Sequence, residues 1–252
     1  MMKKITTQVP ALDKVVDICD YLSDKRGATF TQIYQGLNMA KSTTSSLLSG
    51  MITHGLIRQV GDKYCLGLRL YELGNKAIQQ FDIKNIAMPV LVNLRDSTEL
   101  TCHLGVLEGN TPIYLAKLES PRAIVIRSWE GKRLSLHSSG LGKALMAWLT
   151  DEERNALLTD EETLPRYTDT TITDKRQLGA ELALIRQRGW AYDNEEDSQG
   201  VRCIAVPVFD ANLRVIAAIS VSGVSFQLPE NHHEEIAAML ALAARTITDK
   251  IK

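Results

Sequence analysis

Residues 29–66 read TFTQIYQGLNMAKSTTSSLLSGMITHGLIRQVGDKYCL. Within residues 29–36, the spacing of Phe30, Ile33 and Tyr34 places these side chains on one side of a short helix, which Gly36 ends. Residues 37–40 form a turn, and residues 41–52 have the spacing of a second helix. A helix, a short turn and a second helix in this order predict a helix-turn-helix.

The second helix has two different sides. Its apolar side chains and one threonine methyl recur at three- and four-residue steps: Thr44, Leu47, Leu48, Met51 and Ile52. The other side carries one cation and short hydroxyl side chains, which allow the helix to approach phosphates and base edges closely. We interpret this helix as the one that enters the DNA major groove.

A β-hairpin is predicted directly after this helix. Gly55 is free to take the left-handed conformation that ends a helix, and residues 56–60 and 63–66 read as strands around the turn at Gly61-Asp62. The alternative is a pair of hairpins that only pack inside a larger domain, but the ordered set with a basic hairpin tip favours DNA binding. The expected DNA contacts are Thr29, Lys41, Ser42, Thr43, Ser45, Ser46, Ser49, Arg58 and Lys63.

The bulk composition bounds the class of protein. The chain has 252 residues, 44% of them apolar, which suffices for one large or two ordinary domains. No apolar run approaches the roughly 18 residues of a membrane span, and the N-terminus lacks the apolar core of a signal peptide. The expectation is a soluble, cytoplasmic protein with no membrane partner.

The charge distribution agrees with DNA binding, and the cysteine spacing indicates neither disulfides nor a metal site. Residues 1–66 hold eight Lys and Arg against five Asp, a balance of +3 in a chain whose net charge is −1. A basic excess on this part suits a DNA reader. Cys19, Cys65, Cys102 and Cys203 are scattered, so we expect neither disulfides nor a metal site, and no cofactor.

The sequence predicts three parts: a winged helix-turn-helix domain over 1–66, a linker helix over 67–80 and a second domain over 81–252. In the second domain, strands are expected at 100–107, 111–118, 123–128, 201–209 and 215–223, and helices at 83–97, 141–149, 151–158, 174–188 and 230–252. This order predicts an α+β fold with a mostly antiparallel sheet.

Several short motifs carry a family resemblance over essentially the whole chain. They are Ala40-Lys41-Ser42-Thr43, Tyr64-Cys65-Leu66-Gly67-Leu68, Leu73-Gly74, Gly140-Leu141-Gly142-Lys143-Ala144, Arg188-Gly189-Trp190-Ala191 and the block from Asp193 to Asp210. On these motifs the chain resembles the IclR family of bacterial transcription regulators. The resemblance implies a linker helix used for dimerisation, a GAF/PAS-like α+β effector-binding domain, and operator DNA bound by a homodimer or a dimer of dimers.

One position departs from the family pattern. Relatives often carry an aromatic residue and an Arg in the middle of the recognition helix, where this chain has Ser45 and Ser46. Without an Arg to grip guanine in a bidentate manner, base reading must be shared among Lys41, Ser42, Thr43, Ser46 and Arg58. Operator choice is then expected to depend more on DNA shape.

The effector site is expected at Gly140 and the helix after it. Ser138 or Ser139 can cap that helix, and its exposed backbone N–H groups can accept a carboxylate; the alternative is a tight turn before a packed helix. The resemblance adds positions that line the ligand site. The expected effector-binding residues are Gly140, Leu141, Asp193, Cys203, Ser220 and Ser222, with Ile126, Leu134 and Val201 as apolar walls.

These residue types suit a hydroxylated carboxylate. Ser220 and Ser222 lie two apart on a strand and therefore face the same side. We expect a sugar acid or a small oxo- or hydroxy-acid, with an aromatic acid as the alternative. Asp193 could equally cap a turn, and Cys203 could be a small hydrophobic residue.

The predicted function is a ligand-responsive DNA-binding transcriptional regulator. We expect a repressor of a carbon-catabolism operon that a small carboxylate relieves, although activation stays open. The effector must favour one arrangement of the linker helices to act at all. An enzyme acting on a small acid is the distant alternative, because Ser222-Gly223 lacks the nucleophile elbow of hydrolases and His232-His233 lacks a catalytic spacing.

Overall fold

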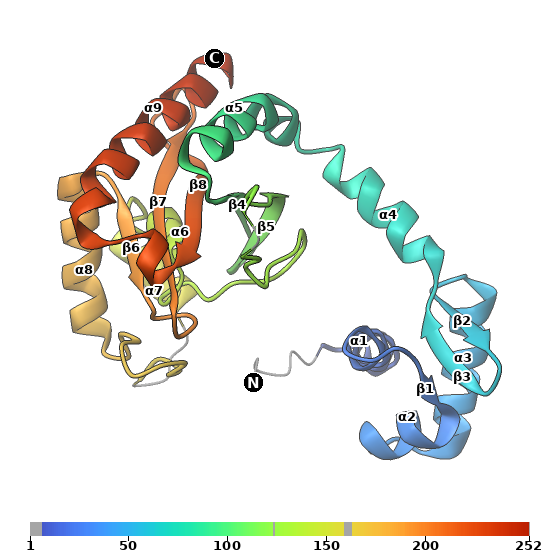
Figure 1. The fold of residues 1–252 in the computed structure, drawn as a ribbon. Helices are drawn as coiled ribbons and strands as arrows, with labels where there is room; N and C mark the ends of the chain where they lie inside the picture. The colour runs from blue at the N-terminus through green and yellow to red at the C-terminus, as the bar shows by residue number, and fades with distance from the viewer. Residues whose placement is uncertain (1–6, 123, 159–162, 252) are drawn as a thin grey trace. The chain divides into compact units, whose positions relative to one another are not determined.

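The computed structural model describes residues 7–122, 124–158 and 163–251. The chain divides between Gln80 and Phe81 into two compact units (Figure 1). No helix in the described ranges is both long and apolar enough to cross a membrane.

The N-terminal unit is a winged helix-turn-helix. Its helices are α1 (Pro10–Ser23), α2 (Phe30–Gly36), α3 (Lys41–Thr53) and α4 (Leu68–Ile78), and its strands are β1 (Ala28–Thr29), β2 (Ile57–Val60) and β3 (Lys63–Leu66). The strands form an antiparallel sheet in the order β1-β3-β2. The sequence did not predict β1, because two residues are too short for any pattern. Gly55 ends α3 with φ of 69°, as expected.

A small apolar core holds this unit together. It joins α1, α2, α3 and β2 through Ile18, Leu22, Ile33, Leu48, Met51 and Ile57, all buried. The helix α4 stands apart from this core, since none of its residues is buried. Its side chains Leu68 and Tyr71 are 78% and 71% exposed, so this predicted linker helix presents apolar surface that nothing in the described chain covers.

The C-terminal unit is built on one antiparallel sheet with the strand order β5-β4-β8-β7-β6. The strands are β4 (Thr101–Glu108), β5 (Thr111–Leu118), β6 (Ala191–Asn194), β7 (Val201–Phe209) and β8 (Val215–Val224). The helices are α5 (Asp82–Thr98), α6 (Gly140–Met146), α7 (Asp151–Leu157), α8 (Lys175–Arg188) and α9 (His233–Ile251). The predicted α+β class is thereby confirmed.

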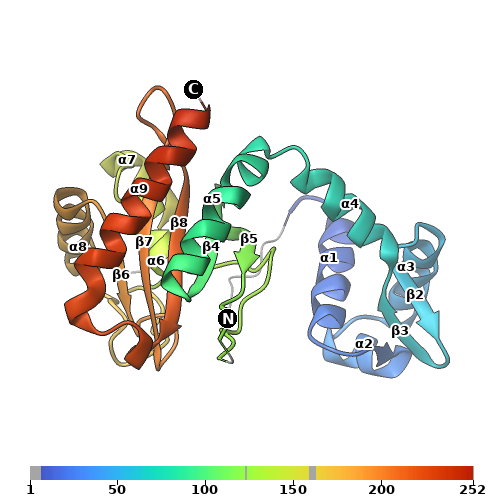
Figure 2. The same cartoon turned by 45° about the horizontal axis from the view of Figure 1, so that its top comes forward.

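The helices cover both faces of this sheet. Figures 1 and 2 show α5 and α9 side by side on one face, with α6 and α8 on the other. On the second face, Leu141 and Leu145 of α6 pack with Leu182 and Ile185 of α8 in one buried cluster. This packing fixes the start of α6 against the middle of the sheet.

Two predicted elements need correction, and one strand was not predicted. Ala123 lies outside the described residues, and residues 124–128 form no strand. Instead the amide of Ser128 donates to the Ile126 carbonyl (2.8 Å), and the ammonium of Lys117 donates to the carbonyls of Ile126 (3.1 Å) and Ser128 (2.9 Å). A side chain from β5 thus takes the place of ladder hydrogen bonds. The short strand β6 was missed, and α9 begins only at His233, after a 3₁₀ turn.

Candidate functional site

The outer side of α3 is a band of unoccupied hydroxyls. Lys41, Ser42, Ser45, Ser46 and Ser49 are exposed, and Thr43 is half-buried. In the described chain, the hydroxyls of these residues make no hydrogen bond, whereas on the inner side Thr44 Oγ1 donates to the Ala40 carbonyl (3.0 Å). The hydroxyl band is therefore free to donate to or accept from an outside partner.

The basic residues frame this band. The Lys41 ammonium lies 5.2 Å from the centre of the Tyr34 ring, which orients it at the start of α3. On the wing, Arg58 and Lys63 are exposed. Thr29 Oγ1 accepts from the Gln32 amide (3.3 Å) and caps α2, and its place among the DNA contacts stays a prediction.

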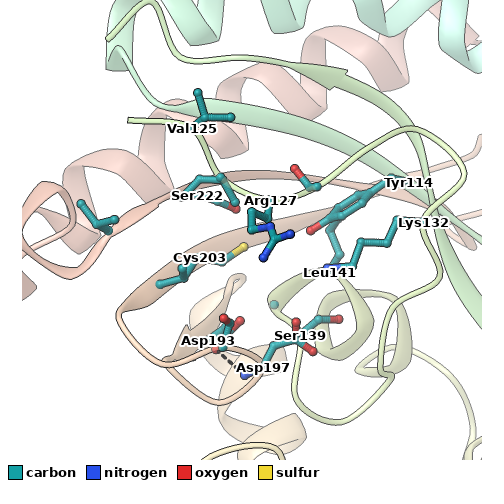
Figure 3. A pocket seen from close by; sticks show the side chains of 16 residues that line it. Tyr114, Val125, Arg127, Lys132, Ser139, Leu141, Asp193, Asp197, Cys203 and Ser222 are labelled. Carbon is teal, nitrogen blue, oxygen red and sulfur yellow. Dashed lines mark hydrogen bonds between the residues drawn. The ribbon is translucent and has the colours of Figure 1, made fainter. Parts of the chain in front are cut away.

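The C-terminal unit contains a cavity of about 210 Å³. Figure 3 shows its lining from β5, the segment after it, the start of α6, and the strands β6, β7 and β8. The lining residues are Tyr114, Val125, Ile126, Arg127, Ser128, Lys132, Ser139, Gly140, Leu141, Asp193, Asp197, Ser198, Val201, Cys203, Ser222 and Val224.

The cavity brings together seven of the nine expected effector residues: Ile126, Gly140, Leu141, Asp193, Val201, Cys203 and Ser222. Leu134 does not line it, because this side chain packs in the core beside α6 and its amide donates to the Pro112 carbonyl (2.8 Å). Ser220 does not line it either. It lies deeper in the sheet, paired with His103 on β4 and Ala205 on β7, and is fully buried.

The start of α6 is more occupied than the sequence indicated. Ser139 Oγ accepts from the Gly142 amide (3.0 Å) and donates to the Ser135 carbonyl (2.5 Å). A Cβ at Gly142 would lie 2.4 Å from the Ser135 oxygen, so this glycine allows close backbone packing. Because α6 has seven residues, only a small dipole is aligned at its first turn.

A buried ion pair ties α6 to the strand beside it. Lys143 is fully buried, and its Nζ lies 2.5 Å from both Glu196 Oε1 and the Tyr192 carbonyl. Next to this pair, Asp193 Oδ1 accepts from the amides of Glu196 (2.8 Å) and Asp197 (3.4 Å). Asp193 therefore both caps this turn and faces the cavity.

Burial sets the charge state of the cavity floor. It raises the pKa of Asp193 to about 8 even though Lys143 lowers it, so this carboxyl is largely protonated at neutral pH and both donates and accepts. Burial also raises the pKa of Cys203 to about 12, which keeps the thiol neutral. Behind the wall, burial and then Lys117 lower the pKa of His103 to about 3.

Sequence reasoning missed one side of the cavity. Tyr114 stacks on the neutral His103 ring with 4.1 Å between centres, and His103 Nε2 shares a 2.8 Å hydrogen bond with Ser128 Oγ. Arg127 comes from the irregular segment that was expected to be a strand, and Lys132 follows that segment. In contrast, His137 is a buried histidine whose ring nitrogens are both engaged, with Ser135 Oγ (3.0 Å) and the Pro165 carbonyl (2.8 Å).

Nothing in the described chain resembles a metal centre. Within residues 7–122, 124–158 and 163–251, no group of three or more His, Cys, Asp or Glu side chains could hold a metal ion.

A winged helix-turn-helix joined to a unit with a cavity that carries hydrogen-bonding and charged side chains defines a DNA-binding regulator that responds to a small molecule. Comparison with known families agrees. The IclR helix-turn-helix domain matches residues 11–61, and the family described as "Bacterial transcriptional regulator IclR C-terminal" matches residues 75–249. The chain therefore belongs to the IclR family of bacterial transcriptional regulators, which are DNA-binding proteins and not enzymes.

Individual relatives cover nearly all of the chain. RhmR of Escherichia coli K12, an uncharacterized HTH-type transcriptional regulator, is 38% identical over 244 residues, 96% of this chain and 94% of RhmR. The Thermotoga maritima IclR structure aligns with a TM-score of 0.77 at 32% identity, and the alignment covers 95% of this chain and 98% of the Thermotoga chain. An IclR homologue from Microbacterium hydrocarbonoxydans, complexed with 4-hydroxybenzoate, has a TM-score of 0.81 at 26% identity and covers 96% and 98%.

Proposed function

We propose that this protein represses a carbon-catabolism operon and that a sugar acid relieves the repression. The observation that carries the proposal is the cavity, which is small and combines apolar walls with hydrogen-bonding and charged side chains. Its volume of about 210 Å³ lies below the roughly 300–1,000 Å³ of drug-sized sites. It corresponds to about seven waters at ~30 Å³ each, which suits a small metabolite.

The lining supports a hydroxylated acid. Asp193, Ser222 and Ser139 offer donors and acceptors to hydroxyls, while Arg127 and Lys132 offer positive charge. Only one aromatic residue, Tyr114, lines the cavity in the described chain. An aromatic acid is the second candidate, since a relative of similar fold binds 4-hydroxybenzoate and Tyr114 could stack on such a ring.

Calorimetric titration of the full chain tests the effector class. The panel contains D-gluconate, D-xylonate, D-glucuronate, pyruvate and 4-hydroxybenzoate. We expect at least one sugar acid to bind more tightly than 4-hydroxybenzoate. Tight binding of 4-hydroxybenzoate with no heat from the sugar acids would establish the second candidate and refute the first.

The DNA contacts are assigned to the α3 hydroxyl band and the basic residues around it: Lys41, Ser42, Thr43, Ser45, Ser46, Ser49, Arg58 and Lys63. Exposure and free hydroxyl groups support this assignment. Footprinting on genomic fragments should reveal one or a few protected sites, which open when the effector is added. Increased protection with the effector would instead indicate activation or corepression.

A homodimer, or a dimer of dimers, is proposed to form through α4. The support is its exposed apolar surface at Leu68 and Tyr71, which a partner helix would remove from water. Sedimentation equilibrium of Tyr71→Lys should show weaker association than Lys76→Glu, a change at an exposed polar site on the same helix. Equal association would place the interface elsewhere. Effector-dependent crosslinking along α4 would then test whether the helices rearrange.

A further inference from the structure

The cavity has two chemically different sides. Arg127 and Lys132 supply cations from the segment after β5. Asp193 on β6 and Asp197 in the turn after β6 supply carboxyls. Figure 3 shows the Arg127 guanidinium directed inward, with Tyr114 on one side of it in this view and Cys203 on the other. A ligand that fills the cavity therefore meets positive charge at one end and hydrogen-bonding acids at the other.

The acidic end is already engaged within the protein. Asp197 Oδ1 accepts from Ser138 Oγ (2.9 Å), and Asp193 Oδ1 accepts from two amides. Lys143 adds a buried positive charge behind them, paired with Glu196. These carboxyls are thus held in place, and their remaining oxygens suit ligand hydroxyls as partners.

The cationic end is not engaged in this way. Among the described residues, Arg127 makes no hydrogen bond and no ion pair, whereas the neighbouring Arg122 pairs with Glu99 and Arg202 lies 3.4 Å from a carboxylate oxygen of Glu195. Among the described residues, the Lys132 ammonium likewise makes no hydrogen bond and no ion pair, and it lies 5.5 Å from the centre of the Trp129 ring. A guanidinium has five N–H donors and matches a carboxylate in bidentate geometry.

We propose that Arg127, with Lys132 beside it, binds the carboxylate of the effector, and that the hydroxylated end lies against Asp193 and Ser222. This assignment rests on the proposed function of the same cavity and deepens it. It places the carboxylate away from the first turn of α6, where Ser139 Oγ already accepts from the Gly142 amide. Asp193 also lines the cavity. Two full charges attract a carboxylate more strongly than the end of a seven-residue helix.

The test compares the binding of each sugar acid with that of the sugar alcohol that lacks its charge. D-gluconate and D-xylonate carry a carboxylate where D-glucitol and xylitol carry a hydroxymethyl group. Calorimetry on the full chain should show that the wild type prefers the acid of each pair by at least about 10-fold, because charge-assisted hydrogen bonds are roughly twice as strong as neutral ones. An alcohol that binds as tightly as its acid would overturn the assignment.

The variants are Arg127→Gln and Arg127→Lys, with Arg133→Gln as control. Arg133 is exposed and close by in sequence, but it does not line the cavity. We expect Arg127→Gln to weaken acid binding by roughly 10- to 100-fold, as for a lost hydrogen bond to a charged group, while alcohol binding is unchanged. Arg127→Lys should retain part of the acid preference, and Arg133→Gln should behave as wild type.

The two failures are distinguishable. If the wild type binds the acids and Arg127→Gln binds them equally well, the Arg127 assignment is wrong and the proposed function stands. If the wild type binds none of the acids, both are wrong. The urea midpoint of Arg127→Gln, followed by the tryptophan fluorescence of the C-terminal unit, serves as the folding measurement, since loss of acid binding at an unchanged midpoint cannot come from unfolding of that unit.

Discussion

Removing the buried cation of α6 should destabilise the C-terminal unit strongly. The Lys143 side chain is fully buried and that of Glu196 is 7% exposed, with 2.5 Å between Nζ and Oε1. Lys143→Met keeps roughly the length of the side chain but removes the cation that pairs with the buried Glu196, whose Oε1 then accepts only from the Asn194 amide (3.4 Å). Breaking such a pair from one side costs about 3–5 kcal/mol.

Protonation of Glu196 sets the lower end of that range. Burial already raises the pKa of this carboxyl with Lys143 present, and without the cation it rises further. Because a carboxyl that takes up a proton avoids part of the cost of an unpaired buried charge, we expect a loss of about 3 kcal/mol. At a slope near 2 kcal/mol/M, this corresponds to about 1.5 M in the urea midpoint.

The assay follows tryptophan fluorescence during urea unfolding. Trp129, Trp148 and Trp190 all lie in the C-terminal unit, so the signal reports that unit alone. Arg214→Met, which removes a pair at a 76% exposed side chain, is the control and should lose no more than about 1 kcal/mol. Adding Glu196→Gln to Lys143→Met should recover part of the loss. The reasoning fails if Lys143→Met loses no more stability than the control.

Three further outcomes are expected. Burial raises the pKa of Asp193 to about 8 from an ordinary 3.8, so the free energy of unfolding should fall as the pH rises between these values, because the unfolded chain releases a proton that the folded chain keeps. Asp193→Asn should remove this trend, and urea midpoints that vary with pH identically in both proteins would contradict it. Gly142→Ala should destabilise the protein by about 1–3 kcal/mol, because the new Cβ meets the Ser135 carbonyl oxygen. Gly179→Ala, in an open stretch of α8, should stabilise it by about 0.5–1 kcal/mol. Similar thermal midpoints for the two variants would count against the packing argument. Lys41→Ala should lower the slope of log affinity against log salt by about 1 in gel shifts, and Lys76→Ala should leave it unchanged; equal slopes for all three proteins would exclude Lys41 as a phosphate contact.

The sequence predicted the N-terminal unit well because its signals are local. Periodicity, Gly55 and the hairpin turn each act within a few residues, and α2, α3, β2 and β3 follow them. The strand β1 escaped because its pairing with β3 joins Thr29 to Lys63, far along the chain. No pattern in Ala28 and Thr29 alone indicates that contact.

Only the part of the cavity that is lined by α6, β6, β7 and β8 could be predicted from the sequence. Gly140, Asp193 and Cys203 carry the family resemblance, whereas Arg127 lies on a segment whose path depends on Lys117 from β5. The apolar run at residues 123–126 reads as a strand, because the contact with the Lys117 ammonium leaves no trace in the local sequence. A lysine such as Lys143 is likewise expected at the surface, and its partner Glu196 follows 53 residues later.

The separation of the two sides of α3 has a consequence for how this regulator could diverge. Thr44, Leu48 and Met51 hold the helix in place, while the serines on the opposite side support no internal contact. Exchanging those serines leaves folding stability nearly unchanged, so gene duplication could yield paralogues with new target promoters in a few substitutions. Changes in inducer preference meet more resistance, since Asp193 and Cys203 serve the folded core as well as the ligand.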